Sequence, residues 1–117
     1  MWRDAAYLLD MQLAAADALR FAAGLDQAGF EASDLHQSAI LRKLEIIGEA
    51  AGQVSSEFRA AHPEIPWSPM IGMRNRLIHA YRVVQLDVVW RVVCQDLPAL
   101  IDALSALIPA EDDPDAP

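Results

Sequence analysis

The sequence predicts an all-α fold, an antiparallel four-helix bundle made by a single domain. Apolar residues recur at alternating steps of three and four, which is the period of a helix that buries one face. No segment shows the sustained alternation of a half-buried strand. The chain has 117 residues, enough for one domain of ordinary size. We expect residues 1–108 to form this domain and residues 109–117 to be a disordered acidic tail.

The first predicted helix runs from Trp2 to about Ala23. Gly24 ends it, because glycine adopts the left-handed backbone conformation without penalty. The apolar stripe of this helix consists of Leu8, Met11, Ala15, Ala18 and Ala22. Residues 24–33 are interpreted as a connection.

The second predicted helix begins at Ser33 or Asp34, either of which can cap it, and reaches about Ala61. Its apolar stripe consists of Ile40, Leu44, Ile47, Ala51, Val54 and Phe58. Gly48 and Gly52 lie one turn apart inside this helix, where each glycine costs up to about 1 kcal/mol relative to alanine. We interpret the pair as a close approach of another helix; a ligand pressed against the backbone is the alternative.

A proline-rich segment, residues 63–69, separates the second helix from the third. Ser68 is a capping hydroxyl, and Pro69 suits the first position of a helix. The third predicted helix therefore runs from Pro69 to about Ala80 or Tyr81.

The fourth predicted helix covers about Asp87 to Leu107. Its inward-facing residues are Val89, Val92, Val93, Leu97, Leu100, Ile101 and Leu104. Pro98 must kink or split this helix, because proline lacks the amide hydrogen and disfavours helix at the residue before it.

The formal net charge of −8 argues against a general nucleic-acid-binding protein, which usually has a basic surface. Four of the nine basic residues nevertheless lie within residues 74–91, where Asp87 is the only acidic one. This local positive charge suits a focused phosphate site. The single Cys94 excludes an intrachain disulfide and a cysteine-rich zinc site. No apolar run approaches the ~18 residues of a membrane span, and no signal peptide is evident. We expect a cytoplasmic protein with no membrane partner, no metal and no cofactor.

Residues 70–81 read Met-Ile-Gly-Met-Arg-Asn-Arg-Leu-Ile-His-Ala-Tyr. They place Arg74 and Asn75 ahead of His79, and Tyr81 two residues after it. This string resembles the signature of the HepT-like toxins of the HEPN superfamily. The resemblance extends to residues 42–50, 66–67, 87–90 and 96–98, whereas residues 24–33 and 109–117 carry no pattern of that family.

The resemblance implies a two-fold dimer of HEPN-type helical domains that cleaves RNA, with tRNA as a candidate, without a metal. The protein would be the toxin of a type II-like toxin–antitoxin module. Its partner would be an MntA-like nucleotidyltransferase antitoxin, which silences the toxin by attaching AMP to Tyr81. An added phosphodiester there would repel and displace an RNA phosphate.

The residue types fit metal-independent RNA cleavage, in which the 2′-hydroxyl attacks phosphorus and a cyclic phosphate forms. His79 can transfer a proton near neutral pH, since the unperturbed pKa of histidine is about 6.5. Arg74 supplies a permanent planar cation for the phosphate oxygens. Asn75 supports them, because it lies on the same helix face as His79 and can orient the imidazole or touch the phosphate. Arg76 and Arg82 are interpreted as further phosphate contacts or as surface charges.

Arg74 and His79 are five residues apart, and an ideal helix places them about 140° apart around its axis. Two such helices related by a two-fold axis would line one cleft with two arginines and two histidines. An unwound helix end near His79 is the alternative, within one chain.

Three other interpretations remain open. The chain could be a non-catalytic helical RNA- or nucleotide-binding partner of a nucleotidyltransferase, or a dimeric scaffold in which Arg74 and His79 are structural. Tyr81 could cover the end of the bundle. Glu45 and Glu49 are interpreted as ionic anchors, either Glu45 with Arg42 or Glu49 with an active-site arginine; general acid/base work or a metal is the alternative for this pair.

Overall fold

The computed structural model describes residues 2–79 and 85–109, with the backbone alone at Trp2 and His79. All regular structure in these ranges is helical, which confirms the predicted fold class. The main elements are α1 (Trp2–Ala22), α3 (Asp34–Gln53), α5 (Trp67–His79) and a C-terminal helix made of α6 (Leu86–Arg91), η2 (Val92–Asp96) and α7 (Leu97–Ser105). Two short helices, α2 (Gln27–Glu31) and α4 (Ser56–Ala61), lie in the connections.

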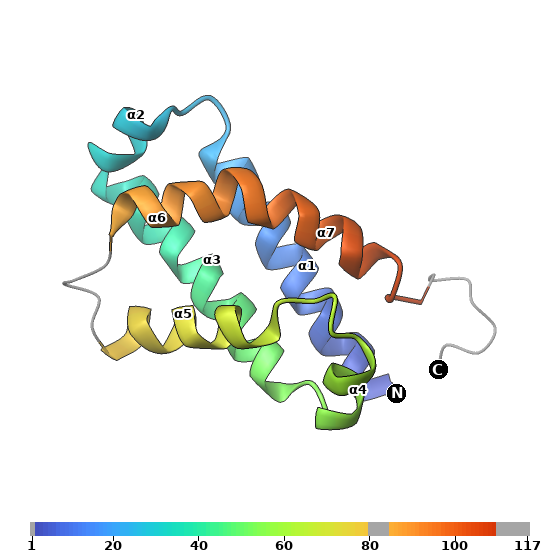
Figure 1. Ribbon diagram of the computed structural model, residues 1–117. Coiled ribbons are helices and arrows are strands. Elements are labelled where there is room, and N and C mark those ends of the chain that lie inside the picture. Colours follow the sequence, from blue (N-terminus) through green and yellow to red (C-terminus); the bar gives the residue numbers. More distant parts are fainter. Residues whose placement is uncertain (1, 80–84, 110–117) are drawn as a thin grey trace.

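The four main helices form an antiparallel bundle, as the sequence predicts (Figure 1). Helix α3 is central, because it packs against α1 on one side and α5 on the other. Helix α7 packs on α1 and leaves α5 with few contacts to the C-terminal helix. Helix α5 is therefore held mainly by α3.

The predicted stripes supply most of the core. All five stripe residues of α1 are buried, as are Ile40, Leu44, Ile47 and Ala51 of α3. The C-terminal helix buries Val89, Val93, Leu97, Leu100 and Leu104, while Val92 and Ile101 are half-buried. The periodicity of apolar residues thus identified the buried face of each of these helices.

The connection after α1 contains a helix that the sequence analysis did not predict. Gly24 has a φ of 82°, which confirms its role as the left-handed residue after α1. Residues 24–33 were predicted to be a connection, but Gln27–Glu31 forms α2, whose start Asp26 caps by accepting a hydrogen bond from the Gly29 amide. Phe30 is fully buried and stacks on Trp90 of α6, with ring centroids 5.3 Å apart. Burial of this one ring fixes the short helix.

The predicted continuous helix from Ser33 or Asp34 to Ala61 is wrong, because it breaks at Val54. That residue is extended, with a ψ of 139°, and ends α3. Ser55 then caps α4 by accepting a hydrogen bond from the Phe58 amide. Ser55 also donates its amide and hydroxyl hydrogens to the buried carboxylate of Asp4 in α1. A tertiary contact thus competes with continuation of the helix.

Helix α5 begins at Trp67, two residues before the predicted start at Pro69. Trp67 is buried, and its indole nitrogen donates a 2.9 Å hydrogen bond to the His62 carbonyl oxygen. The Pro66 carbonyl oxygen accepts from the Met70 amide, so the first turn forms there. Pro69 is tolerated within this turn, because the first amides of a helix have no partner in the helix.

Pro98 changes the geometry of the last helix without inserting a loop. The Leu97 amide donates to the Val92 carbonyl oxygen, five residues back, and Val92–Asp96 is a π-helical turn. Proline lacks an amide hydrogen, and its ring crowds the carbonyl four residues earlier. The wider turn before Pro98 accommodates both effects. The C-terminal helix then ends at Ser105, two residues before the predicted end at Leu107.

No described helix is long and apolar enough to cross a membrane. The predicted acidic tail lies outside the described residues except for the exposed Pro109.

Candidate active site

Arg74 lies on the side of α5 that faces α3. Its side chain is half-buried, and its Cβ atom packs directly on Gly48 of α3. One guanidinium nitrogen, Nη1, donates a 3.2 Å hydrogen bond to the side-chain oxygen of the neighbouring Asn75. Asn75 is exposed, and its amide nitrogen has two further hydrogens to donate. The two residues therefore form a donor-rich unit on α5.

The guanidinium of Arg74 has no ion-pair partner within residues 2–79 and 85–109. Its Nε atom is buried and lacks a hydrogen-bond acceptor in the same ranges. Glu45 instead pairs with Arg42, with a nitrogen–oxygen distance of 3.2 Å, which confirms one of the two predicted anchors. Glu49 is exposed, and among the described residues it holds no arginine. Among the described residues, no carboxylate neutralises the positive charge of Arg74.

His79 is the last residue of α5, and the backbone from Arg74 to His79 is regular α-helix. The side chain of His79 lies outside the described parts, as do Tyr81 and Arg82 entirely. The convergence of Arg74 and His79 on one phosphate therefore stays a prediction, as do the roles of the other two residues.

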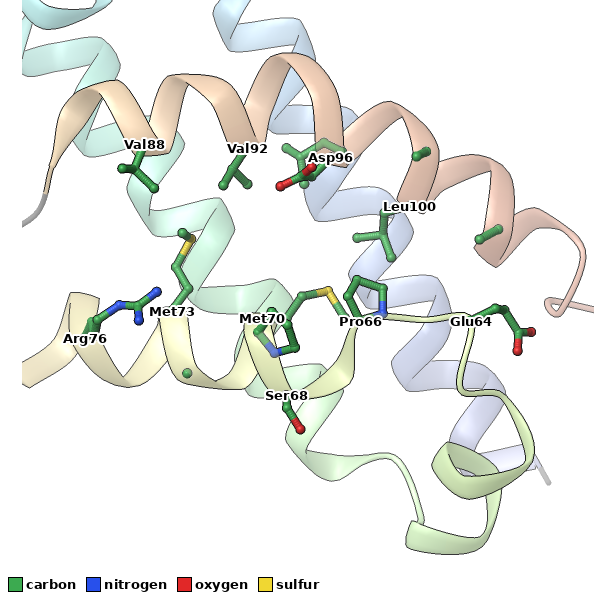
Figure 2. A pocket seen from close by; sticks show the side chains of 15 residues that line it. Glu64, Pro66, Ser68, Met70, Met73, Arg76, Val88, Val92, Asp96 and Leu100 are labelled. Carbon is green, nitrogen blue, oxygen red and sulfur yellow. The ribbon is translucent and has the colours of Figure 1, made fainter.

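Arg76 lies on another side of α5 from Arg74. It is exposed and lines a groove of about 680 Å³ between α5 and the C-terminal helix. Figure 2 shows Met73 pointing from α5 toward α6 in this groove, with Arg76 beside it and Asp96 on the opposite wall. The rest of the lining is mainly apolar, including Met70, Val88, Val92 and Leu100. Within one chain, Arg76 does not join Arg74.

A second hollow lies between α3 and α5, with a volume of about 450 Å³. Its lining residues are Ser38, Leu41, Arg42, Glu45, Leu77 and Ile78. Ile78 follows Arg74 by four residues, so the two share a face of α5. This hollow was not predicted from the sequence. Its only signal was an apolar residue, Ile78, next to the histidine of the motif, and that side chain is 42% exposed.

Within the part of the chain that the structure describes, no three histidine, cysteine, aspartate or glutamate side chains are grouped to hold a metal ion. The donors that the described site does offer are the Arg74 guanidinium and the Asn75 amide. Both are suited to phosphate oxygens.

The comparisons with known proteins place the chain in a family. The family described as "Ribonuclease HepT-like" matches residues 11–107. A Methanocaldococcus jannaschii protein named "Putative RNase MJ1380" is 36% identical over 95 residues, which cover 81% of this chain and 87% of that protein. A Thermococcus cleftensis protein named "Probable ribonuclease HepT" is 50% identical over 64 residues, 55% of this chain and 58% of that protein. No solved structure matches this chain significantly. The chain therefore belongs to the family of HepT-like ribonucleases.

Proposed function

We propose that this chain is a metal-independent endoribonuclease that uses Arg74 and His79. In the proposed reaction the ribose 2′-hydroxyl attacks the adjacent phosphorus and loses its proton. The bond to the 5′-oxygen of the next nucleotide breaks, and that oxygen takes up a proton. The products are a 2′,3′-cyclic phosphate and a 5′-hydroxyl end. His79 transfers the proton, while Arg74 binds the phosphate oxygens as negative charge develops on them.

The observation that carries this proposal is the state of Arg74. Arg74 is half-buried, and its buried Nε atom has no hydrogen-bond acceptor and its guanidinium no carboxylate partner in the described ranges, an arrangement that a bound anion would complete. The hydrogen bond to Asn75 fixes one edge of the guanidinium. The two-nitrogen fork of arginine matches the oxygens of a phosphate.

We propose a homodimer as the catalytic unit. Because α5 is regular helix through His79, its backbone keeps the two residues about 140° apart around the axis. A two-fold axis beside α5 would let the Arg74 of one subunit and the His79 of the other reach one phosphate. The dimer would then be required for chemistry as well as for stability.

The biological setting follows from family membership and is also a proposal. The chain would be the toxin of a toxin–antitoxin module that acts on RNA in the cytoplasm, with tRNA as a candidate substrate. An MntA-like nucleotidyltransferase would silence it by transferring AMP from ATP to the Tyr81 hydroxyl, with release of pyrophosphate. Intact mass after incubation with that enzyme and ATP tests this step: Tyr81→Phe should abolish the mass gain, and no gain in the wild type contradicts it.

The central experiment incubates the purified protein with total RNA and analyses the new ends. We expect cyclic-phosphate ends, lost in Arg74→Ala and in His79→Ala. Arg20→Ala is the matched control, because Arg20 is an exposed arginine paired with Asp17 on α1. Cleavage that persists in His79→Ala would show that another group transfers the proton. If the wild type binds RNA without cleaving it, the chain is the non-catalytic binding partner. If the wild type neither binds nor cleaves RNA, the scaffold interpretation is favoured.

A further inference from the structure

Gly48 of α3 lies where α3 and α5 come closest around Arg74. A Cβ atom placed on Gly48 would overlap the Cβ of Arg74 and would lie 2.6 Å from the Met70 carbonyl oxygen. It would also lie 3.1 Å from the Cγ of Arg74. Met70 and Arg74 are one helical turn apart, so Gly48 contacts two successive turns of α5. The absence of a side chain at Gly48 allows this approach.

Gly52 provides the internal comparison. It lies one turn further along α3, yet a Cβ atom there would meet nothing within 4 Å in the described structure. The prediction that another helix approaches closely is confirmed for Gly48, whereas no other helix of the described chain approaches Gly52. Alanine favours the helix over glycine at both positions, with a smaller gain at Gly52, which lies in the last turn of α3. Only alanine at position 48 would have to displace α5.

We infer that Gly48 is a positioning residue for Arg74: it sets the depth at which the guanidinium is held against α3. This inference rests on the proposed function of Arg74. The contact is made by the Cβ of Arg74 itself, the atom from which the side chain projects. Ordinary carbon–carbon contacts are about 3.5–4.0 Å, so an added methyl group must move the Arg74 backbone by roughly 1 Å.

Helix α5 is anchored on both sides of this contact, so the displacement falls on the two turns that hold Met70 and Arg74. Trp67 is buried at the start of the helix and bonded to the His62 carbonyl oxygen. Leu77 is buried beyond Arg74 toward the helix end. The Gly48 contact lies between these two anchors. A displacement of about 1 Å at a catalytic group can cost on the order of 100-fold in rate.

The test compares Gly48→Ala, Gly52→Ala, Arg74→Ala and the double variant Gly48→Ala/Arg74→Ala. We expect Gly48→Ala to lose about 10- to 100-fold in kcat/KM for RNA cleavage. Gly52→Ala should retain wild-type kcat/KM. The double variant should equal Arg74→Ala, because Gly48 acts through Arg74.

A second readout is the salt dependence of binding to a single-stranded RNA oligonucleotide. Losing one phosphate contact lowers the slope of log K against log salt concentration by about 0.7. Gly48→Ala should share this loss with Arg74→Ala, and Gly52→Ala should not. A Gly48 contact that only supported the fold would leave the slope unchanged.

Circular dichroism melting establishes that each variant is folded at the assay temperature. If Gly48→Ala is unfolded, it is measured again in the Gly52→Ala background, which gains helix propensity. If Gly48→Ala is unfolded both alone and in the Gly52→Ala background, the inference is wrong. It is also wrong if the losses in kcat/KM of Gly48→Ala and Arg74→Ala multiply in the double variant. Should Arg74→Ala itself cleave normally, the proposed function fails first, and that outcome is separate from the comparison of the two glycines.

Discussion

Asp4 and Ser55 are joined by two hydrogen bonds across 51 positions of sequence. The Asp4 carboxylate accepts a 2.9 Å hydrogen bond from the Ser55 amide and a 2.7 Å hydrogen bond from the Ser55 hydroxyl. Asp4 is only 3% exposed, and Ser55 is half-buried. The pair ties the first turn of α1 to the break between α3 and α4, and so closes one end of the bundle.

Asp4→Asn should destabilise the fold by about 1–3 kcal/mol, since the new amide would present hydrogens to one of the two donors of Ser55 and leave it unsatisfied. Urea unfolding measures the difference. Asp10→Asn is the matched control, because Asp10 is an exposed aspartate on the same helix. Equal midpoints for the two variants would mean that the Asp4–Ser55 pair contributes nothing.

The same pair predicts a pH dependence. Burial alone would raise the pKa of Asp4, but the hydrogen bonds from Ser55 and the nearby Arg3 charge hold the pKa below its ordinary value of 3.8. A depressed carboxyl pKa stabilises the fold above the unfolded pKa, and this stabilisation is lost as pH falls through the folded one. The gap in unfolding free energy between wild type and Asp4→Asn should therefore narrow below about pH 4. A gap that is constant from pH 7 to about pH 2 would contradict this assignment.

Phe30→Ala should cost about 3–5 kcal/mol, because the ring is fully buried and its removal leaves a cavity beside Trp90. Thermal and urea unfolding give the value. Leu35→Ala is the control: Leu35 is 76% exposed, so its truncation should stay within about 0.5 kcal/mol. A loss in Phe30→Ala no larger than in Leu35→Ala would show that α2 is not anchored by this ring.

Arg74→Lys should behave almost as poorly as Arg74→Ala, with a loss in kcat on the order of 100-fold or more. Lysine keeps the charge but not the planar fork that binds two phosphate oxygens. Single-turnover cleavage of one defined RNA measures the effect, with Arg20→Lys as the control for loss of a surface arginine. Full activity in Arg74→Lys would reduce the role of Arg74 to a point charge.

Mixing the two inactive variants tests the shared site. A heterodimer of Arg74→Ala with His79→Ala retains one arginine and one histidine, on different subunits. If one phosphate is served across the two-fold axis, unfolding and refolding the mixture should restore on the order of a quarter of wild-type activity. A site formed within one chain predicts that the mixture stays inactive, because every chain then lacks one of the two groups.

The sequence by itself determined the four main helices, the buried faces of three of them and the segment that carries the candidate chemistry. Helix periodicity is a local property, so the stripe from Leu8 to Ala22 and the one from Ile40 to Val54 were readable without the fold. The left-handed end of α1 at Gly24 is equally local. For the candidate site, the motif gave the residue types, and the roles of Arg74, Asn75, His79 and Tyr81 stay predictions.

The tertiary structure decided where helices stop and which side chains meet. Helix α3 ends at Val54 because the carboxylate of Asp4, 51 residues earlier in the chain than Ser55, accepts hydrogen bonds from Ser55. Helix α2 forms because the ring of Phe30 packs on the ring of Trp90. Gly48 and Gly52 are equivalent in the sequence, and only the crossing of α5 over α3 separates them. These contacts join residues distant in sequence, so no local period encodes them.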